Sequence, residues 1–290
     1  MKRCKEKCIF QSHAPTLKKV LGTLLSNSSV FQHVLKVPSL MEVNIVELTI
    51  LFFAAFLAYV VSILSGGGGA LLLIPITTFI AGPMYTAPAI NLGNFIGRPV
   101  RVFLFWRYIQ WNLVWYYAPA AALGAWVGVR FFSLVNPLYL QLIIGVFLVS
   151  TLIQFKLGKR RKSFHVSPWH FTPLGFVVSG ISSLTGGTGP VQNPFYLNLG
   201  VEKEEMIGTK TANAFFMGLV QIGTYTYFEV LDAQVLLYGL VLGAGGSIGN
   251  IAGKKLLGKI SLLNFRRLVI ALMVISGLIL TIRSVIMLAE

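Results

Sequence analysis

Polar side chains that could bind a ligand occur inside or beside long apolar segments of this sequence. No charged residue occurs from 48 to 97 or from 211 to 228, and these segments are bordered by Arg98 and Lys210. Cations, amides and hydroxyl groups are hydrogen-bond donors, so a set that lacks acids suits a small anion. The candidate side chains in or next to the apolar segments are Asn91, Asn94, Arg98, Gln192, Asn193, Thr209, Lys210, Asn213 and Gln221.

Two glycine-rich breaks interrupt apolar runs, and each break has a proline after it. Glycine leaves a helix without steric cost, and proline removes a backbone donor. Broken backbone is tolerated at membrane depth only inside the protein, and free N–H groups next to a helix start attract anions. Close helix packing is the alternative role for such glycines. The candidate residues are Ser65, Gly66, Gly67, Gly68 and Gly69 in the first break, and Thr185, Gly186, Gly187, Thr188 and Gly189 in the second.

Lys210 is expected to supply the principal positive charge to the bound anion. It precedes Asn213 by three residues, so the two side chains share a face of one helix. A lysine at the bilayer centre costs about 2.5–3.5 kcal/mol on insertion scales, which a facing anion could offset. In the alternative interpretation Lys210 reaches the membrane surface, because Glu205 is only a few residues away.

The distribution of acidic and histidine residues excludes several kinds of catalysis. The chain has nine acidic residues, and none lies between 48 and 201, so no carboxylate cluster for Mg²⁺ is expected in that part. The four histidines show no zinc-binding spacing, and the glycine breaks lack the lysine of a phosphate-binding loop. We therefore expect no catalytic residues, no metal site and no cofactor.

Composition indicates an all-α polytopic membrane protein. Of 290 residues, 55% are hydrophobic and only 11% are charged, whereas soluble domains have about 25% charged residues. The net charge of +15 does not favour nucleic acid as a partner, because the basic residues form short clusters between apolar segments. The expected partners are the lipid bilayer and a small anion.

The apolar part of the chain contains an internal repeat. Pro75 and Pro194 are 119 residues apart, as are Asn94 and Asn213, and the glycine pairs 124/245 and 128/249 are each 121 apart. We therefore predict a polar basic N-terminal arm without fixed structure (1–40), a first transmembrane repeat (41–163) and a second (164–290). Each repeat has a glycine-broken re-entrant helix pair and three transmembrane helices. Such a unit crosses the membrane an odd number of times, so the second copy is inverted.

The basic residues favour this inverted arrangement over eight full crossings. Without the arm and Lys210, 16 basic residues remain, and the inverted arrangement places 14 of them on the cytoplasmic side. Eight crossings would divide them nine to seven. Cytoplasmic loops carry an excess of lysine and arginine, so the first distribution is the expected one.

Residues 43–285 resemble the sulfite exporter TauE/SafE family, a family of transporters for sulfur compounds. The resemblance rests on both glycine breaks with Pro75 and Pro194, on residues 207–215 and on residues 245–253. It implies a protein of the bacterial inner membrane that moves sulfite, sulfonates such as sulfoacetate, or related anions without ATP hydrolysis. Thr188 and Pro190 interrupt the second loop, which is more uniformly glycine in the family.

The sequence thus predicts a secondary transporter or facilitator for small sulfur-containing anions, with its site between the two glycine breaks. Transport of another anion, such as a carboxylate, is the alternative within the same class. An intramembrane enzyme or a non-catalytic membrane assembly protein is the alternative of another class.

Overall fold

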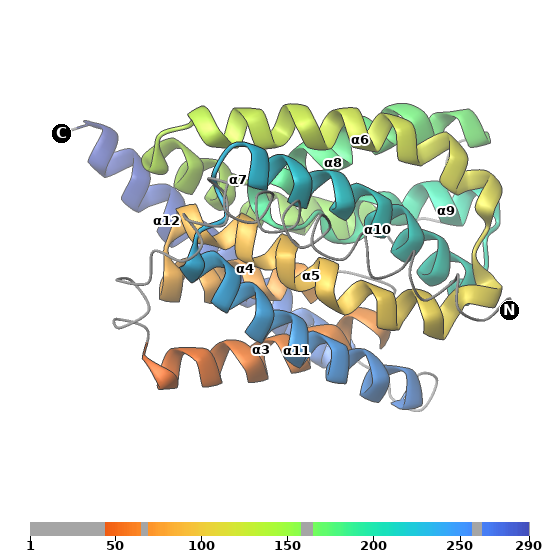
Figure 1. Ribbon diagram of the computed structural model, residues 1–290, viewed down its shortest axis with the longest axis horizontal. Helices are drawn as coiled ribbons and strands as arrows, with labels where there is room; N and C mark the ends of the chain where they lie inside the picture. Colours follow the sequence, from red (N-terminus) through yellow and green to blue (C-terminus); the bar gives the residue numbers. More distant parts are fainter. Residues whose placement is uncertain (1–43, 65–68, 158–164, 257–262, 290) are drawn as a thin grey trace, which may run out of the picture.

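The computed structural model describes residues 44–64, 69–157, 165–256 and 263–289. Within these ranges every regular element is a helix, with ten α-helices and three 3₁₀ turns (Figure 1). The all-α prediction is confirmed for this part of the chain. Two predicted features lie wholly or partly outside the described ranges: the arm 1–40, and residues 65–68 of the first glycine break. The basic residues between 158 and 162 lie outside them as well.

The first five α-helices follow the predicted order of a broken pair and three longer helices. Gly82, at φ +89°, separates the second helix from the third, and Pro83 starts the third helix where no backbone donor is needed. The helices are α3 (Ile45–Leu64), α4 (Gly69–Ala81), α5 (Pro83–Phe105), α6 (Trp111–Leu134) and α7 (Pro137–Leu157), with the turn η2 (Trp106–Tyr108) after α5.

The remaining helices repeat this order. The first of these helices, α8 (Phe171–Thr185), is followed by Gly186, which has the left-handed conformation at φ +84°. The N–H of Gly186 donates to the carbonyl oxygen of Ser182 at 2.9 Å and so caps the helix. The elements are η3 (Pro168–His170), α8 (Phe171–Thr185), η4 (Gly189–Gln192), α9 (Asn193–Leu199), α10 (Lys203–Tyr227), α11 (Ala233–Leu256) and α12 (Leu263–Ala289).

Helix α11 packs against both α3 and α5, and the three helices run in the same direction. Gly245 and Gly249 of α11 lie directly against the backbone carbonyls of Phe52 and Phe56 in α3, so both chains advance together along the contact. A side chain at either glycine would overlap these carbonyls. The two glycines therefore allow the backbones of α3 and α11 to approach closely.

The same arrangement recurs between α6 and α8, with α10 packed on α6. Gly124 of α6 lies against the carbonyl of Phe176, and Gly128 lies against Gly180. The glycines at positions 124 and 128 thus make in α6 the contact that those at positions 245 and 249 make in α11. Both pairs of glycines therefore allow the backbones of two helices to approach closely.

Helices α3, α5 and α11 form one three-helix group, and helices α6, α8 and α10 form the other. The two groups meet where α5 contacts α10, and these two helices run in opposite directions. Beyond the end of α5, in the segment between η2 and α6, Gln110 donates a side-chain hydrogen bond of 2.7 Å to Glu205 at the start of α10. Farther back along α5, the ring of Phe95 stacks on Phe215 at 5.6 Å, and Asn91 reaches Tyr225 near the end of α10. The three-helix groups therefore meet with opposite orientations.

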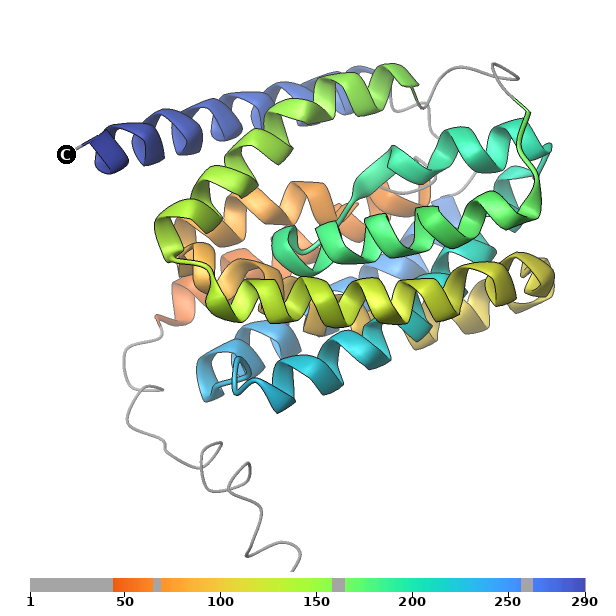
Figure 2. The ribbon, with the colours of Figure 1, turned by 90° about the horizontal axis from the view of Figure 1, so that it is seen from above.

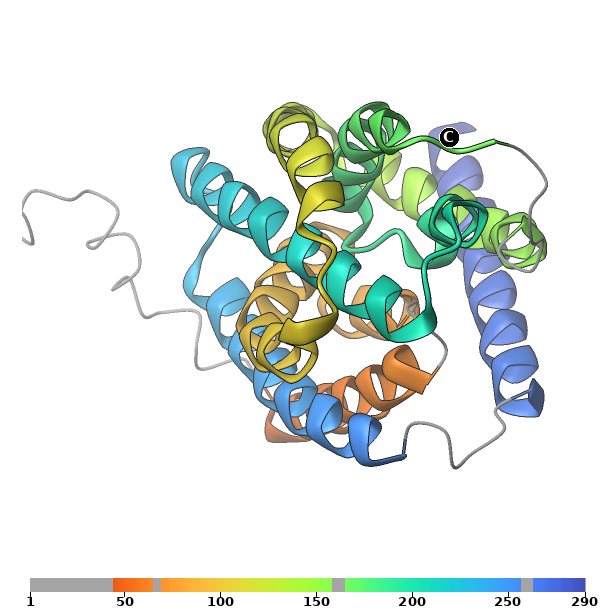
Figure 3. The same ribbon diagram turned by 90° about the vertical axis from the view of Figure 1, so that its right-hand side faces the viewer.

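Helices α7 and α12 form a separate antiparallel pair along one side of the bundle (Figures 2 and 3). Gly145 of α7 lies against Thr281 of α12, and Gly277 lies against Leu148. Their contacts with the other helices are fewer and include α4, α5 and α8.

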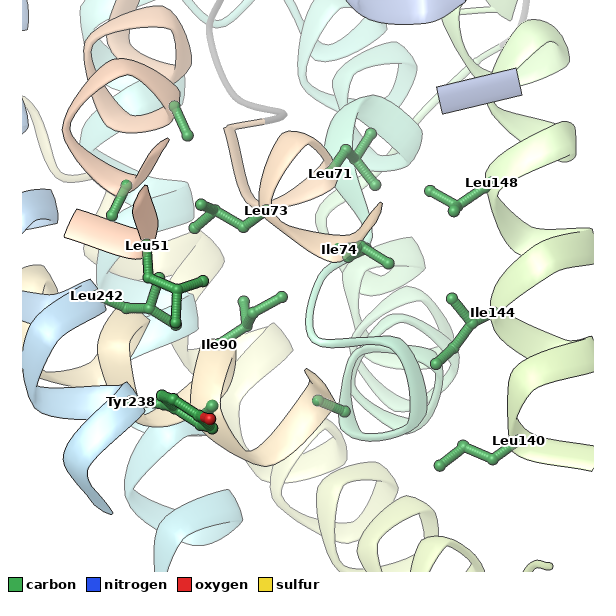
Figure 4. Packing of buried hydrophobic residues seen from close by; sticks show 14 of the residues in the cluster. Leu51, Leu71, Leu73, Ile74, Ile90, Leu140, Ile144, Leu148, Tyr238 and Leu242 are labelled. Carbon is green, nitrogen blue, oxygen red and sulfur yellow. The ribbon is translucent and has the colours of Figure 1, made fainter. Parts of the chain in front are cut away.

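The largest apolar cluster surrounds the short helix α4. Figure 4 shows Leu71 and Ile74 of α4 facing Ile144 and Leu148 of α7, while Leu73 lies toward α3 and α11. These α4 side chains are fully buried. The half-helix is thus fixed between the central helices and the outer pair by hydrophobic contacts.

By length and hydropathy alone, two described helices are long and apolar enough to cross a membrane. These are α3 and α11, with mean hydropathies of 2.2 and 1.6. In α5 and α10, charged and amide side chains lower the hydropathy. Large apolar side chains nevertheless remain exposed on many helices, including Phe103 on α5, Trp115 on α6 and Ile282 on α12.

We expect the Gly124→Ala variant to be less stable than the wild type. Its new Cβ would overlap the Phe176 carbonyl, a rigid backbone group, and such overpacking typically costs about 1–3 kcal/mol or more. Thermal unfolding in detergent measures the difference. Gly223→Ala in α10 is the matched control, because a Cβ there meets nothing within 4 Å. Equal melting temperatures for the two variants would contradict the packing role of Gly124.

Candidate functional site

A polar cavity of about 130 Å³ lies where α5 crosses α10. Its walls also include residues of α3, α6, α8, η4 and α11, so both three-helix groups contribute to it. Sites for drug-sized ligands usually measure about 300–1,000 Å³, so this cavity suits a much smaller ligand. The predicted site residues that line it are Asn94, Arg98, Gly187, Thr188, Gln192 and Lys210.

Three cationic side chains line this cavity, and each has a partner that orients it. Arg98 donates from Nη1 to the carbonyl of Ala214 at 2.5 Å, and Arg101 donates from Nη1 to Ser62 Oγ at 3.0 Å. The Nζ of Lys210 donates to Asn193 Oδ1 at 2.6 Å. None of the described lining residues is acidic, so the cavity carries a concentrated positive charge.

Two tyrosines orient the amide groups on opposite walls. Tyr59 of α3 donates from its hydroxyl to Asn94 Oδ1 at 2.6 Å, and Gln192 Nε2 donates to the hydroxyl of Tyr117 at 3.2 Å. Asn94 Nδ2 also donates to the carbonyl of Gly186 at 3.4 Å. The two tyrosines are almost fully buried, so these groups have fixed positions.

The second glycine break brings backbone to the cavity. Thr185 Oγ1 lies 2.9 Å from the carbonyl oxygens of both Ile181 and Gly187, so its single proton can be donated to either of them where the chain leaves α8. Gly187, Thr188 and then Gln192 consequently face the cavity. The half-helix α9 that follows has only seven residues.

Four predicted residues belong to buried networks next to the cavity rather than to its wall. Asn91 Nδ2 donates to the carbonyl of Ser182 at 3.0 Å, and Gln221 Nε2 donates to Ser183 Oγ at 3.0 Å. The other two bind residues that do not line the cavity: Asn213 Nδ2 donates to the Tyr196 hydroxyl at 3.0 Å, and Thr209 Oγ1 accepts from the Gln110 N–H at 2.9 Å.

The remaining predicted positions have other placements. Gly186 and Asn193 contact lining residues by hydrogen bonds without being part of the wall, as does Thr185. Gly69 begins α4 and Gly189 begins η4. Ser65, Gly66, Gly67 and Gly68 lie outside the described residues.

Several lining residues were not predicted as site residues. Arg101 follows Arg98 by about one helical turn, and this spacing could have identified it. Its Nε is buried, with no hydrogen-bond partner among the described residues. Nothing in the local sequence distinguishes Tyr59 and Tyr117 from the other aromatic residues of the apolar helices. The lining residues outside the prediction include Tyr59, Ser62, Arg101, Tyr117, Ser182, Met217 and Asn250.

The chemistry of this wall is that of anion binding. Guanidinium, ammonium and amide groups donate hydrogen bonds to oxyanions, and a guanidinium can contact two oxygens at once. Within the described ranges, no group of three or more histidine, cysteine, aspartate or glutamate residues could hold a metal ion.

Comparison with known proteins agrees with this geometry. Residues 51–280 match the protein family described as Sulfite exporter TauE/SafE. No curated protein and no solved structure matches the chain. The match spans all ten α-helices, wholly or in part, and every described residue that lines the cavity. The chain therefore belongs to the sulfite exporter TauE/SafE family.

Proposed function

We propose that this protein is a secondary transporter or facilitator that moves small sulfur-containing anions, such as sulfite or sulfoacetate, across the bacterial inner membrane as a multi-pass protein. The observation that carries the proposal is the convergence of Arg98, Arg101 and Lys210 on one small cavity whose described lining lacks acids. The family description supplies the chemical class of the anion.

Binding of an anion would relieve an electrostatic cost at this cavity. Like charges in a medium of low dielectric repel strongly, and a cation is expensive to withdraw from water. The carbonyl of Ala214 and the amide oxygen of Asn193 are only partial compensation, because both acceptors are neutral. An oxyanion between the cations would supply the opposite charge.

The helix arrangement supports two inverted repeats, 41–163 and 164–290, around this cavity. Helices α3, α5 and α11 run one way, while their predicted counterparts α8, α10 and α6 contact one another and run the other way. The glycine contacts of α3 with α11 recur between α8 and α6. Binding sites at the interface of two such repeats are common in secondary transporters.

Purified protein in liposomes tests the proposed function. We expect sulfite or sulfoacetate to cross the membrane chemically unchanged, at a rate well above that of protein-free liposomes. A carboxylate of similar size, such as acetate, serves as the comparison anion. Chemical conversion of the substrate, or flux of acetate alone, would contradict the proposal.

The Lys210→Gln variant should bind the transported anion about ten- to a hundredfold more weakly while expressing normally. The substitution removes one charge-assisted hydrogen bond, worth about 1.5–3 kcal/mol, and keeps a polar side chain of similar length. Lys210→Arg should restore binding poorly, because the larger guanidinium changes the geometry. The measurement is the concentration dependence of sulfite flux.

Arg130→Gln is the matched control for loss of a cation. The guanidinium of Arg130 lies over the ring of Phe228, 5.0 Å from its centroid, and does not line the cavity. Sulfite flux through the Arg130→Gln variant should equal that of the wild type. If Lys210→Gln also kept wild-type affinity, Lys210 would not belong to the binding site.

Cysteine labelling tests the inverted arrangement. The sequence has two cysteines, Cys4 and Cys8, which serine would replace. In this background, Tyr227→Cys should react with a membrane-impermeant maleimide on intact cells, whereas His165→Cys should react only after permeabilisation. Both original side chains are exposed. Labelling of the two positions from the same side would contradict the inversion.

A further inference from the structure

A second cavity, of about 720 Å³, lies at the end of α5 and is separate from the central one. Its described lining comes from the last turn of α5, the turn η2 and the last turn of α11. None of these lining residues is acidic, and Arg107 and Lys254 are cationic. The charge of this cavity therefore suits an anionic group.

Lys254 is held at this cavity by two contacts. Its Nζ donates to the carbonyl of Leu104 at 2.5 Å and lies 5.2 Å from the centroid of the Phe105 ring. An ammonium group has three protons, and this carbonyl takes one of them. Lys254 thus caps the C-terminal end of α5, and its remaining N–H groups still present positive charge to the cavity.

The wall beside these cations is aromatic and strongly exposed. The exposed fractions are 82% for Phe103, 55% for Trp106 and 47% for Tyr108. Trp106 also packs against Trp111 of α6, with 5.2 Å between ring centroids. Tryptophan and tyrosine gather where the bilayer meets water, so this end of α5 lies at the level of lipid headgroups.

We propose that this cavity binds the headgroup phosphate of an anionic phospholipid. Arg107 and Lys254 would contact phosphate oxygens, and Phe103 and Trp106 would lie along the first carbons of the acyl chains. A free inorganic phosphate would satisfy the cations but would leave the exposed aromatic wall uncovered. Basic pockets between helix ends are known to bind lipid headgroups in this way.

The Arg107→Gln variant tests the proposal without removing the contact between Lys254 and α5. Full-length protein in detergent would be titrated with phosphatidylglycerol, and bound lipid would be counted by native mass spectrometry. We expect the variant to bind phosphatidylglycerol at least about tenfold more weakly than the wild type, because it loses a charge-assisted contact. Lys254→Gln should weaken lipid binding similarly.

Lys255→Gln is the matched control, because Lys255 is exposed on the same turn of α11 but does not line the cavity. It should bind phosphatidylglycerol as the wild type does. If Lys254→Gln fails to fold, Arg107→Gln still decides the question. Unchanged lipid binding in Arg107→Gln would overturn the proposal.

Two further ligands identify the source of the phosphate. Phosphatidylcholine, whose headgroup has no net charge, should bind the wild type much more weakly than phosphatidylglycerol. Inorganic phosphate at millimolar concentration should not displace the lipid. Equal binding of phosphatidylcholine, or full displacement by inorganic phosphate, would overturn the assignment to an anionic lipid.

Discussion

The position of the cavity depends on the crossing of α5 and α10, and the hydrogen bond from Arg98 to the carbonyl of Ala214 is one of the contacts that hold this crossing. Residue 218, one turn farther along α10, is glycine, and a Cβ there would lie 2.6 Å from Arg98 Nη1, so the guanidinium would have to move. The bond directs the half-buried guanidinium of Arg98 toward a backbone oxygen and joins the two groups of helices at the cavity. This contact places one of the three cations of the site, Arg98, at the cavity.

Close glycine contacts on either side of this crossing keep the remaining helices in place. A membrane environment offers helices little hydrophobic drive to associate, because lipid tails are as apolar as leucine. Backbone contact through glycine gives dispersion energy instead, and it occurs between α3 and α11 as well as between α6 and α8. These contacts hold Tyr59 of α3 and Tyr117 of α6 on opposite walls of the cavity.

Positive charge is used differently at the two cavities. In the central cavity the cations are half-buried and oriented by neutral acceptors. At the end of α5 the cations are exposed among aromatic side chains, as at a lipid surface. The same two residue types, arginine and lysine, thus line both cavities, but in different surroundings.

The sequence by itself determined the helical class and the order of the helices, because hydropathy is a property of local segments, and it predicted a repeat and a positively charged site. It also predicted Arg98 and Lys210, which both line the cavity, since cations next to long apolar segments are conspicuous. Only the tertiary structure brought Tyr59, Arg101 and Asn250 to the same cavity and directed Asn213 and Thr209 to other partners. Those outcomes depend on how helices distant in the sequence rotate and cross, which periodicity within one helix does not encode.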